Sequence, residues 1–389
     1  ILDERGIVRM TQNEFIDVEG ASKLAAICEE LGASRIFLIT GKSSYDSSGA
    51  RALIEKALKG RRVFRYSEFS AGPNFEDVIK GVTFFKETSP DLVVAIGGGT
   101  ALDMAKSINA FQAHEKDVNL LDLARGKESI KSQGLPLVAL PTTSGTGSEA
   151  THFAVVYDEG VKHSVASPHI RPAHVVLDWR LTENLPAGIT AHSGLDALCQ
   201  AIESIWSINA NETSLVYAEE ALQLVFDNLE NAFVGAKPEN REALMRGANL
   251  AGRAIDITFT TAPHALSYPV TSGYGVPHGA AVALFIAPML LYNSEVSTAD
   301  CADLRGPKTT GRRISRIVQV LGCENADGAA NRLWQMLDQL QCPQRLREIG
   351  VTTSEQVQAI AGKVNAERLA NNPRRIPADA LSRLMEGLI

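Results

Sequence analysis

The chain changes character near its midpoint, and this change constrains the fold more than any other feature. Before about residue 185, short apolar runs alternate with stretches of helical spacing, whereas long helical patterns dominate afterwards. Strands that alternate with helices indicate a mostly parallel α/β sheet. The chain has 389 residues, which exceeds the roughly 250–300 residues at which a single core stops growing. We therefore predict two domains, an α/β domain over residues 1–184 and a helical domain over residues 185–389.

The predicted elements follow from the periodicity of the apolar residues. In the first domain, strands are expected over residues 35–40, 62–66, 91–96 and 135–140, and helices over residues 50–58, 74–87 and 101–113. Continuous apolar strands of this kind fit a sheet that is buried on both faces. In the second domain, helices are expected over residues 194–206, 212–228, 239–255 and 329–340, and a mobile surface loop over residues 297–312.

Composition excludes several classes of protein. The net charge is −7 and the only dense basic stretches are short pairs, whereas a nucleic-acid-binding protein usually carries a basic face. No apolar run is long enough to cross a membrane, and no signal peptide is visible at the N-terminus. The five cysteines are odd in number and form no CxxC pair, so we expect reduced thiols in a cytoplasmic protein that binds neither nucleic acid nor membrane.

A glycine-rich turn follows the strand over residues 91–96. The run Gly97-Gly98-Gly99-Thr100-Ala101-Leu102-Asp103 opens the next helix, where glycines let the backbone approach a pyrophosphate and the helix end offers N–H donors. This run lacks the GxGxxG dinucleotide pattern, so a plain tight turn is the alternative.

A second polar loop follows the strand over residues 135–140. Residues 141–149 read Pro-Thr-Thr-Ser-Gly-Thr-Gly-Ser-Glu. Hydroxyl groups and glycines this dense suit a polar ligand at the carboxyl end of a sheet. The alternative is an ordinary surface loop rich in serine and threonine.

A carboxylate and two imidazoles suggest a metal site in the second half. Asp196 and Gln200 share one face of a helix at spacing i, i+4. His264 and His278 are separated by a segment rich in turn residues. One carboxylate and two imidazoles can hold a divalent metal and leave a position for a substrate oxygen. The alternative is that these histidines only pack or face solvent.

These pieces together resemble the iron-containing (group III) alcohol dehydrogenases. That family carries Asp-Ala-x-x-His-Ala-x-Glu, a histidine about sixty residues later, and then Pro-His-Gly. The matching residues here are the segment 196–203, His264, and Pro277-His278-Gly279. The resemblance runs from about residue 36 to residue 288.

The resemblance implies a Rossmann-like dinucleotide-binding domain followed by a helical domain, as in the dehydroquinate synthase-like fold. It also implies NAD(P)H-dependent hydride transfer to a small aldehyde, one divalent metal (Fe or Zn), and a homo-oligomer. The metal ligands would be Asp196, Gln200, His264 and His278. The cofactor would be bound by Gly41, Lys42, Ser43, Gly97, Gly98, Gly99, Thr100, Asp103, Thr142, Thr143, Ser144, Thr146 and Ser148.

Two positions depart from the family's pattern. Gln200 stands where most members have a metal-binding histidine, and an amide oxygen is a weaker ligand than imidazole for iron or zinc. Tyr268 stands where members commonly carry a histidine thought to relay protons, so Tyr268 either donates a proton or simply packs. With these departures, a cofactor-binding protein with an inactive site is the alternative from another class.

Cofactor choice is argued from the turn after the strand over residues 35–40. NAD-preferring relatives often place an aspartate there to bind the adenosine ribose. This chain has Gly41-Lys42-Ser43 instead, a cation and a hydroxyl that suit a 2′-phosphate. We therefore expect NADP(H) rather than NAD(H), the alternative being a turn with a solvated lysine.

The substrate expectation rests on polar residues around the site. Lys162, His192, Arg253 and Thr261 would suit an anionic aldehyde, although Arg253 can instead pair with Asp256 on its own helix. The segments 200–207 and 264–269 look like the phosphonoacetaldehyde reductase branch, which forms 2-hydroxyethylphosphonate. The alternatives are a sulfoacetaldehyde reductase or a general short-chain alcohol dehydrogenase. Tyr268, Lys162 and His192 are the expected catalytic side chains.

Overall fold

The computed structural model describes residues 12–16, 19–114, 118–235 and 237–389. The chain forms two compact units, Ile1–Leu185 and Pro186–Ile389. That these units are independently folding domains with a boundary between residues 184 and 185 stays a prediction.

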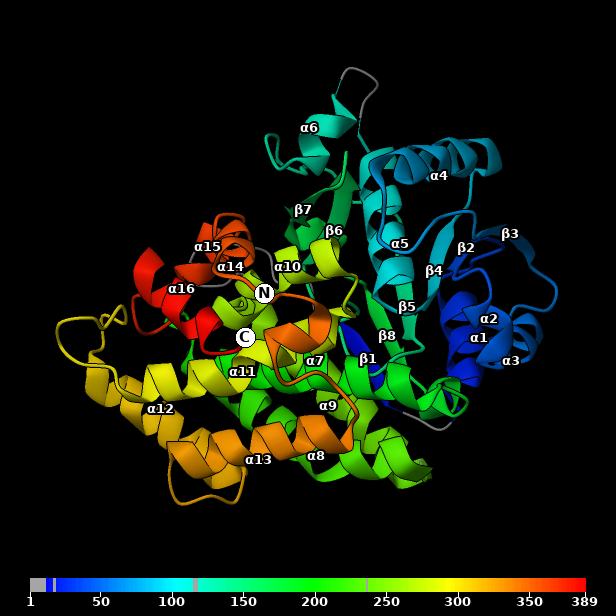
Figure 1. Ribbon diagram of the computed structural model, residues 1–389. Helices are drawn as coiled ribbons and strands as arrows, with labels where there is room; N and C mark the ends of the chain where they lie inside the picture. Colours follow the sequence, from blue (N-terminus) through cyan, green and yellow to red (C-terminus); the bar gives the residue numbers. More distant parts are fainter. Residues whose placement is uncertain (1–11, 17–18, 115–117, 236) are drawn as a thin grey trace. The chain divides into compact units, whose positions relative to one another are not determined.

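The first unit is built on a six-stranded parallel sheet with the order β1-β8-β5-β4-β2-β3 (Figure 1). Its strands are β1 (Asn13–Ile16), β2 (Arg35–Thr40), β3 (Arg62–Tyr66), β4 (Leu92–Gly97), β5 (Leu137–Pro141) and β8 (His174–Leu177). A separate antiparallel hairpin comprises β6 (Phe153–Asp158) and β7 (Val161–Ala166). The four strands expected from the sequence are the centre and one side of this sheet.

Helices cover both faces of the sheet because the side chains of each strand point alternately to two faces, and both faces are apolar. Phe37 and Val93 pack with α4 (Phe75–Thr88) and α5 (Gly99–Gln112), whereas Ile36 and Leu92 pack with α1 (Gly20–Glu30) and α3 (Ala50–Ala57). Side chains at successive strand positions point to opposite faces, so each strand contributes to both cores. The remaining short helices of this unit are α2 (Ser44–Ser47), α6 (Leu120–Ala124), η1 (Pro168–Ile170) and η2 (Trp179–Thr182).

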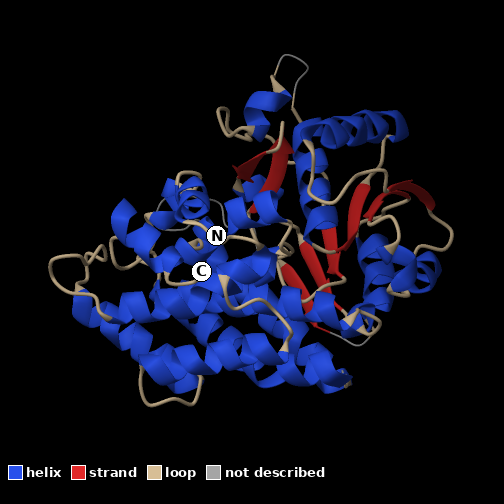
Figure 2. Cartoon of the chain, in the orientation of Figure 1, coloured by secondary structure: helices blue, strands red, loops and turns tan. Residues whose placement is uncertain are grey.

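The described residues of the second unit form helices joined by loops, with no strand (Figure 2). Its helices are α7 (Ala187–Trp206), α8 (Glu212–Gly235), α9 (Pro238–Thr258), α10 (Ala262–Tyr274), α11 (His278–Ser294), α12 (Pro307–Val320), α13 (Ala326–Gln339), η3 (Leu346–Ile349), α14 (Ser354–Ala361), α15 (Ala366–Leu369) and α16 (Ala378–Glu386). Helix α7 packs against α8, α9 and α11, and all of them contribute to one core. The predicted fold class, a parallel α/β sheet followed by a helical domain, is confirmed.

The segment expected to be a mobile loop is anchored instead. Helix α12 already begins at Pro307, and the turn before it holds the buried carboxylate of Asp303. Arg305 and Arg313 both pair with Asp303, at 2.8 and 3.2 Å. Both arginines also donate to the carbonyl of Ala210, so this turn is tied to the α7–α8 connection. The sequence showed only the polarity of these residues and not their long-range partners.

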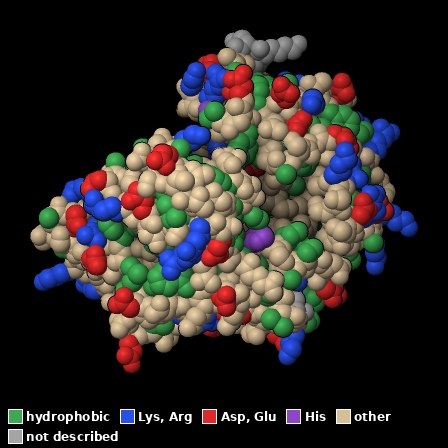
Figure 3. Space-filling view, in the orientation of Figure 1, with side chains coloured by type: hydrophobic (Ala, Val, Ile, Leu, Met, Phe, Trp, Pro, Cys, Tyr) green, Lys and Arg blue, Asp and Glu red, His purple; other side chains and the backbone are tan. Residues whose placement is uncertain are grey.

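The surface carries mixed charge on the face seen in Figure 3, where lysine and arginine are interspersed with aspartate and glutamate. Within the described residues, no helix has both the length and the apolar composition needed to cross a membrane. All five cysteines are free thiols.

Candidate metal centre and nucleotide-binding loops

The two polar loops predicted from the sequence lie side by side. They follow β4 and β5, which are neighbouring parallel strands, so both loops lie at the carboxyl edge of the sheet. A Cβ atom on Gly98 would lie 3.3 Å from the side chain of Thr143, and one on Gly99 would lie 2.8 Å from Thr146. The glycines are therefore needed because the second loop packs directly on the first.

The remaining loop residues form a polar lining. The backbone N–H of Thr142 donates to the carbonyl of Gly97 at 3.0 Å, which joins the loops, and Thr100 accepts from the N–H of Gly72 at 3.4 Å. The Ser144 hydroxyl is buried and has no hydrogen-bond partner within the part of the chain that the structure describes. A buried hydroxyl in that state suits a polar ligand, so these loops fit a dinucleotide.

A buried network under the loops was not foreseen from the sequence. Ser148 donates to Asp103 at 2.6 Å, and Lys106 donates to Ser148 at 3.0 Å and to the carbonyl of Phe153 at 2.9 Å. Burial raises the pKa of Asp103, although the charges of Lys106 and Lys162 oppose the shift. The network ties α5 to the second loop and to β6. Direct cofactor contacts of Asp103 and Ser148 stay a prediction.

The turn after β2 carries a second cation. Lys42 pairs with Glu68 at 2.9 Å, and both side chains are largely exposed. Arg65, which the sequence analysis missed, donates to the Thr40 hydroxyl at 2.8 Å and to the carbonyl of Gly41 at 3.2 Å. Ser43 directly precedes α2. Two positive charges therefore lie beside the expected ribose position.

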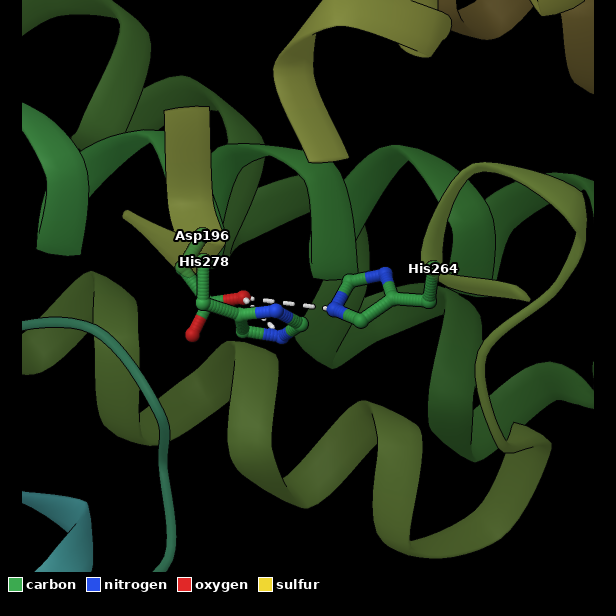
Figure 4. A group of neighbouring side chains, drawn as sticks. All are labelled: Asp196, His264 and His278. Carbon is green, nitrogen blue, oxygen red and sulfur yellow. Dashed lines mark hydrogen bonds and ion pairs between the residues drawn. The ribbon is translucent and has the colours of Figure 1, made fainter. Parts of the chain in front are cut away.

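The second unit brings together the three side chains predicted to bind a metal, Asp196, His264 and His278. Their ligand atoms all lie within 4.8 Å of one another, and the three side chains converge in Figure 4. His264 Nε2 lies 3.2 Å and His278 Nε2 lies 3.9 Å from Asp196 Oδ1. Burial opposes ionisation of Asp196, but the hydrogen bond from His264 and the charge of His278 prevail and lower its pKa. A carboxylate and two imidazoles in this arrangement fit a divalent metal.

Gly279 explains how these ligands meet. Asp196 lies on α7, and His278 is the first residue of α11. A Cβ atom on Gly279 would lie only 1.8 Å from the carbonyl oxygen of His192 and 3.0 Å from the backbone nitrogen of Asp196. The start of α11 can therefore touch the backbone of α7 only because residue 279 has no side chain.

Glu203 orients the imidazole of His264 by contacting Nδ1, the ring nitrogen that does not contact Asp196. It lies two helical turns beyond Asp196 on α7, is fully buried, and contacts Nδ1 of His264. Burial alone would lower the pKa of His264, but the carboxylates of Glu203 and Asp196 raise it to about 10. A carboxylate on the second nitrogen fixes the tautomer of a metal-binding histidine. The i, i+7 spacing within segment 196–203 was the signal that could have identified Glu203.

Thr261 has a different role from the one expected. The sequence suggested a substrate contact, but Thr261 is fully buried. Its hydroxyl donates to Glu203 at 2.9 Å and accepts from the indole of Trp206 at 2.8 Å. Its backbone N–H also donates to Glu203, at 2.8 Å. Thr261 therefore holds Glu203 in place rather than facing a ligand.

The two departures from the family pattern lie beside the ligands. Gln200 hydrogen-bonds to the carboxylate of Asp196 and helps to lower its pKa. Because a carboxylate only accepts, the amide N–H₂ of Gln200 is the donor, and its carbonyl oxygen is the atom that would serve a metal. The ring of Tyr268 is stacked on His278, with centroids 5.9 Å apart and planes at 12°.

Replacing Gln200 with histidine is expected to raise the affinity for Zn²⁺, since imidazole nitrogen is a better ligand than an amide oxygen. Calorimetric titration of both proteins measures the change. Gln223→His is the matched control, because the Gln223 amide also donates to an aspartate four residues away, Asp227, but on the surface of α8. Equal or weaker binding by Gln200→His would mean that residue 200 does not face the metal.

The two other side chains predicted to be catalytic, His192 and Lys162, lie in different units. His192 lies one turn before Asp196, and burial lowers its pKa. It lines a cavity of about 480 Å³ with Tyr274, Val276, Pro277, Cys342 and Glu348. Lys162 lies on β7 in the first unit, where its charge acts on Asp103.

Arg253 was expected to bind the substrate, but its guanidinium packs between two helices. Its guanidinium stacks on the ring of Tyr217 at 4.3 Å and donates to the hydroxyl of that tyrosine at 2.9 Å. The two residues belong to α9 and α8, so Arg253 stabilises the packing of these helices. The sequence could not reveal this partner, because Tyr217 lies 36 residues away in the chain.

Two family models match the chain. Residues 15–179 match the model described as iron-containing alcohol dehydrogenase, and residues 190–388 match the C-terminal model of the same family. The resemblance inferred from the short motifs is thus confirmed over nearly the whole chain.

Individual proteins that are similar to this chain over most of its length are named as dehydrogenases or reductases. A 4-hydroxybutyrate dehydrogenase of Cupriavidus necator is 28% identical and covers 95% of this chain and 96% of its own. A phosphonoacetaldehyde reductase of Streptomyces viridochromogenes is 33% identical, over 76% of this chain and 75% of its own. The solved structure of sulfoacetaldehyde reductase from Bifidobacterium kashiwanohense in complex with NAD+ is 28% identical, with a TM-score of 0.88, and covers 97% of this chain and 96% of its own.

Proposed function

The chain belongs to the iron-containing alcohol dehydrogenase family of oxidoreductases, and on this premise we propose that it reduces a small anionic aldehyde with NADP(H). The observation that carries the proposal is the convergence of Asp196, His264 and His278 within 4.8 Å. Phosphonoacetaldehyde, which would yield 2-hydroxyethylphosphonate, is the proposed substrate, and sulfoacetaldehyde is the nearest alternative.

The metal ligands and their support define the reacting end of the site. A divalent metal held by Asp196, His264 and His278 would act as a Lewis acid that polarises the aldehyde oxygen. Glu203 keeps Nε2 of His264 directed at this position by binding its Nδ1. The partly exposed ring of His278 marks the side from which substrate would approach.

Proton transfer would fall to side chains that flank the ligands. Tyr268 is the proposed donor to the alkoxide oxygen, because its ring is stacked on His278 and a phenol can donate a proton. His192 is the alternative, since burial lowers its pKa and favours the neutral imidazole, which can relay a proton between its two nitrogens. Comparing the pH profiles of Tyr268→Phe and His192→Gln separates the two.

Cofactor binding is proposed at the loops of the first unit. A nicotinamide dinucleotide would supply the hydride, and its phosphates would lie against Gly98 and Gly99. NADP(H) is proposed over NAD(H) because Lys42 and Arg65 flank the turn after β2. One relative was solved with NAD+, so both cofactors belong in the assay.

An anionic substrate is supported by the names of the three relatives, which refer to compounds with a carboxylate, a phosphonate and a sulfonate. We expect phosphonoacetaldehyde or sulfoacetaldehyde to exceed propanal in kcat/KM by at least about tenfold. One charge-assisted hydrogen bond contributes roughly 1.5–3 kcal/mol, and about 1.4 kcal/mol corresponds to tenfold. Oxidation of NADPH and of NADH, followed at 340 nm, measures all three aldehydes. Equal performance of propanal would instead identify a general short-chain alcohol dehydrogenase.

A further inference from the structure

Phe259 has a backbone conformation that side chains rarely adopt. It connects α9 to α10 with φ of 56° and ψ of 170°. For residues other than glycine, positive φ is uncommon, and this combination approaches a region used almost only by glycine. Such conformations persist where the surroundings impose them, and they concentrate at ligand-binding sites. A phenylalanine at this position therefore needs an explanation.

The residues on either side of Phe259 are fixed by hydrogen bonds. The carbonyl of Thr258 accepts from the Ser207 hydroxyl at 3.0 Å and from the Asn209 amide at 3.2 Å. The carbonyl of Thr260 accepts from the Asn371 amide at 3.0 Å. The connection cannot relax without breaking these bonds.

The same connection is joined to the metal centre. Thr261, the last residue before α10, donates through its N–H to Glu203 at 2.8 Å. Glu203 is the carboxylate that orients His264. Phe259 is thus two residues from a contact of the ligand-orienting carboxylate, and its side chain remains partly exposed.

A cation lies on the ring of Phe259. The guanidinium of Arg368 is 4.9 Å from the ring centroid. Arg368 belongs to α15, which packs against α10, the helix that carries His264. The side chain of Asn365 accepts from the N–H of Arg368 at 2.9 Å, so the backbone of Arg368 is also held. A guanidinium stacked on an aromatic ring presents its N–H groups at its edge, which suits bidentate binding of an oxyanion.

We propose that Phe259 and Arg368 form the wall of the substrate site that binds the anionic group of the aldehyde. This inference rests on the proposed function and identifies the residues that select the substrate class. Phe259 keeps its unfavourable backbone conformation because its ring aligns Arg368. Arg368 takes the part that the sequence analysis assigned to Arg253.

The first test replaces the cation. Arg368→Gln is expected to lower kcat/KM for sulfoacetaldehyde by at least about tenfold, mainly through KM, and to leave propanal within about twofold. Arg368→Lys, which keeps the charge and loses the planar fork, should fall between. Arg332→Gln is the matched control, since Arg332 stacks on Phe226 at 4.8 Å in the α8–α13 packing, and it should keep the wild-type preference.

The second test addresses the backbone of Phe259. Phe259→Gly and Phe259→Ala both remove the ring, but only glycine adopts positive φ without strain. We expect the glycine variant to melt about 2 °C or more above the alanine variant, and both to lose several-fold in kcat/KM for sulfoacetaldehyde. A glycine variant that melts no higher than the alanine variant, or that keeps the full anion preference, would overturn the role given to Phe259.

The outcomes separate this inference from the proposed function. If wild-type protein prefers sulfoacetaldehyde and Arg368→Gln keeps that preference, another group binds the anion and this inference fails alone. If Arg368→Gln lowers the activity on both aldehydes equally, Arg368 is structural and the inference also fails. If wild-type protein prefers neither phosphonoacetaldehyde nor sulfoacetaldehyde over propanal, the anionic substrate class and this inference fail together.

Discussion

Asp196→Ala and His278→Ala are each expected to lower kcat/KM by on the order of 10²-fold or more. Both side chains contribute ligand atoms to the same cluster, and Asp196 touches both imidazoles. Loss of the metal would remove Lewis-acid stabilisation of the developing oxyanion, an effect that costs several kcal/mol in comparable sites. Steady-state kinetics with sulfoacetaldehyde and measurement of bound metal by mass spectrometry test this directly.

The control for these variants is His169→Ala. His169 lies on η1 in the first unit, and its ring nitrogen Nδ1 lies 3.4 Å from the amide oxygen of Gln133. It is not part of the metal cluster, so its loss should change neither metal content nor rate. Near-wild-type activity in both ligand variants, with the fold intact by circular dichroism, would remove the metal from the mechanism. Loss of metal without loss of activity would have the same consequence.

Gly279→Ala is expected to have the second large effect. The added Cβ would lie 1.8 Å from the His192 carbonyl oxygen, a backbone atom that cannot rotate away. Helix α11 must then move from α7, and His278, the adjacent residue, moves with it. A displacement of about 1 Å in a reacting group can cost about 10²-fold in rate, and overpacking of this kind costs about 1–3 kcal/mol of stability. Kinetics, metal affinity and denaturant unfolding measure the three consequences.

Gly273→Ala is the matched control for that substitution. Gly273 lies six residues earlier in the chain on α10, and a Cβ there would meet no described atom within 4 Å. Since alanine is favoured over glycine within a helix by roughly 0.5–1 kcal/mol, this variant should be at least as stable as wild type and equally active. Comparable loss in both variants would show that Gly279 acts through flexibility rather than through close packing.

The sequence predicted well those features that depend on neighbouring residues, namely the central strands and the short motifs. The central strands β2, β4 and β5 were visible because apolar runs buried on both faces are continuous. The predicted ranges match β2 and the edge strand β3 fully. The edge strand β1 and its neighbour β8 were missed, since each has only four residues and no periodic signal. The three candidate metal ligands that the structure brings together could be predicted because the family motifs are local in the chain.

Errors arose where a side chain's partner is distant in the sequence. Arg253 was expected at the substrate, but Tyr217 of α8 holds it. Thr261 was expected to contact the substrate as well, but Glu203 and Trp206 use its hydroxyl. In both cases residue type indicated what the group can bind, and the packing of helices decided what it does bind.

The sequence by itself determined the fold class, the family and the three candidate metal ligands, because strand periodicity and motif spacing are properties of neighbouring residues. Only the tertiary structure decided which groups surround those ligands. Glu203 reaches His264 across 61 residues of chain, and Arg368 reaches Phe259 across the packing of α15 on α10. Burial and contact of such pairs depend on how helices pack, and no local pattern in the chain encodes the approach of α11 to α7 that Gly279 permits.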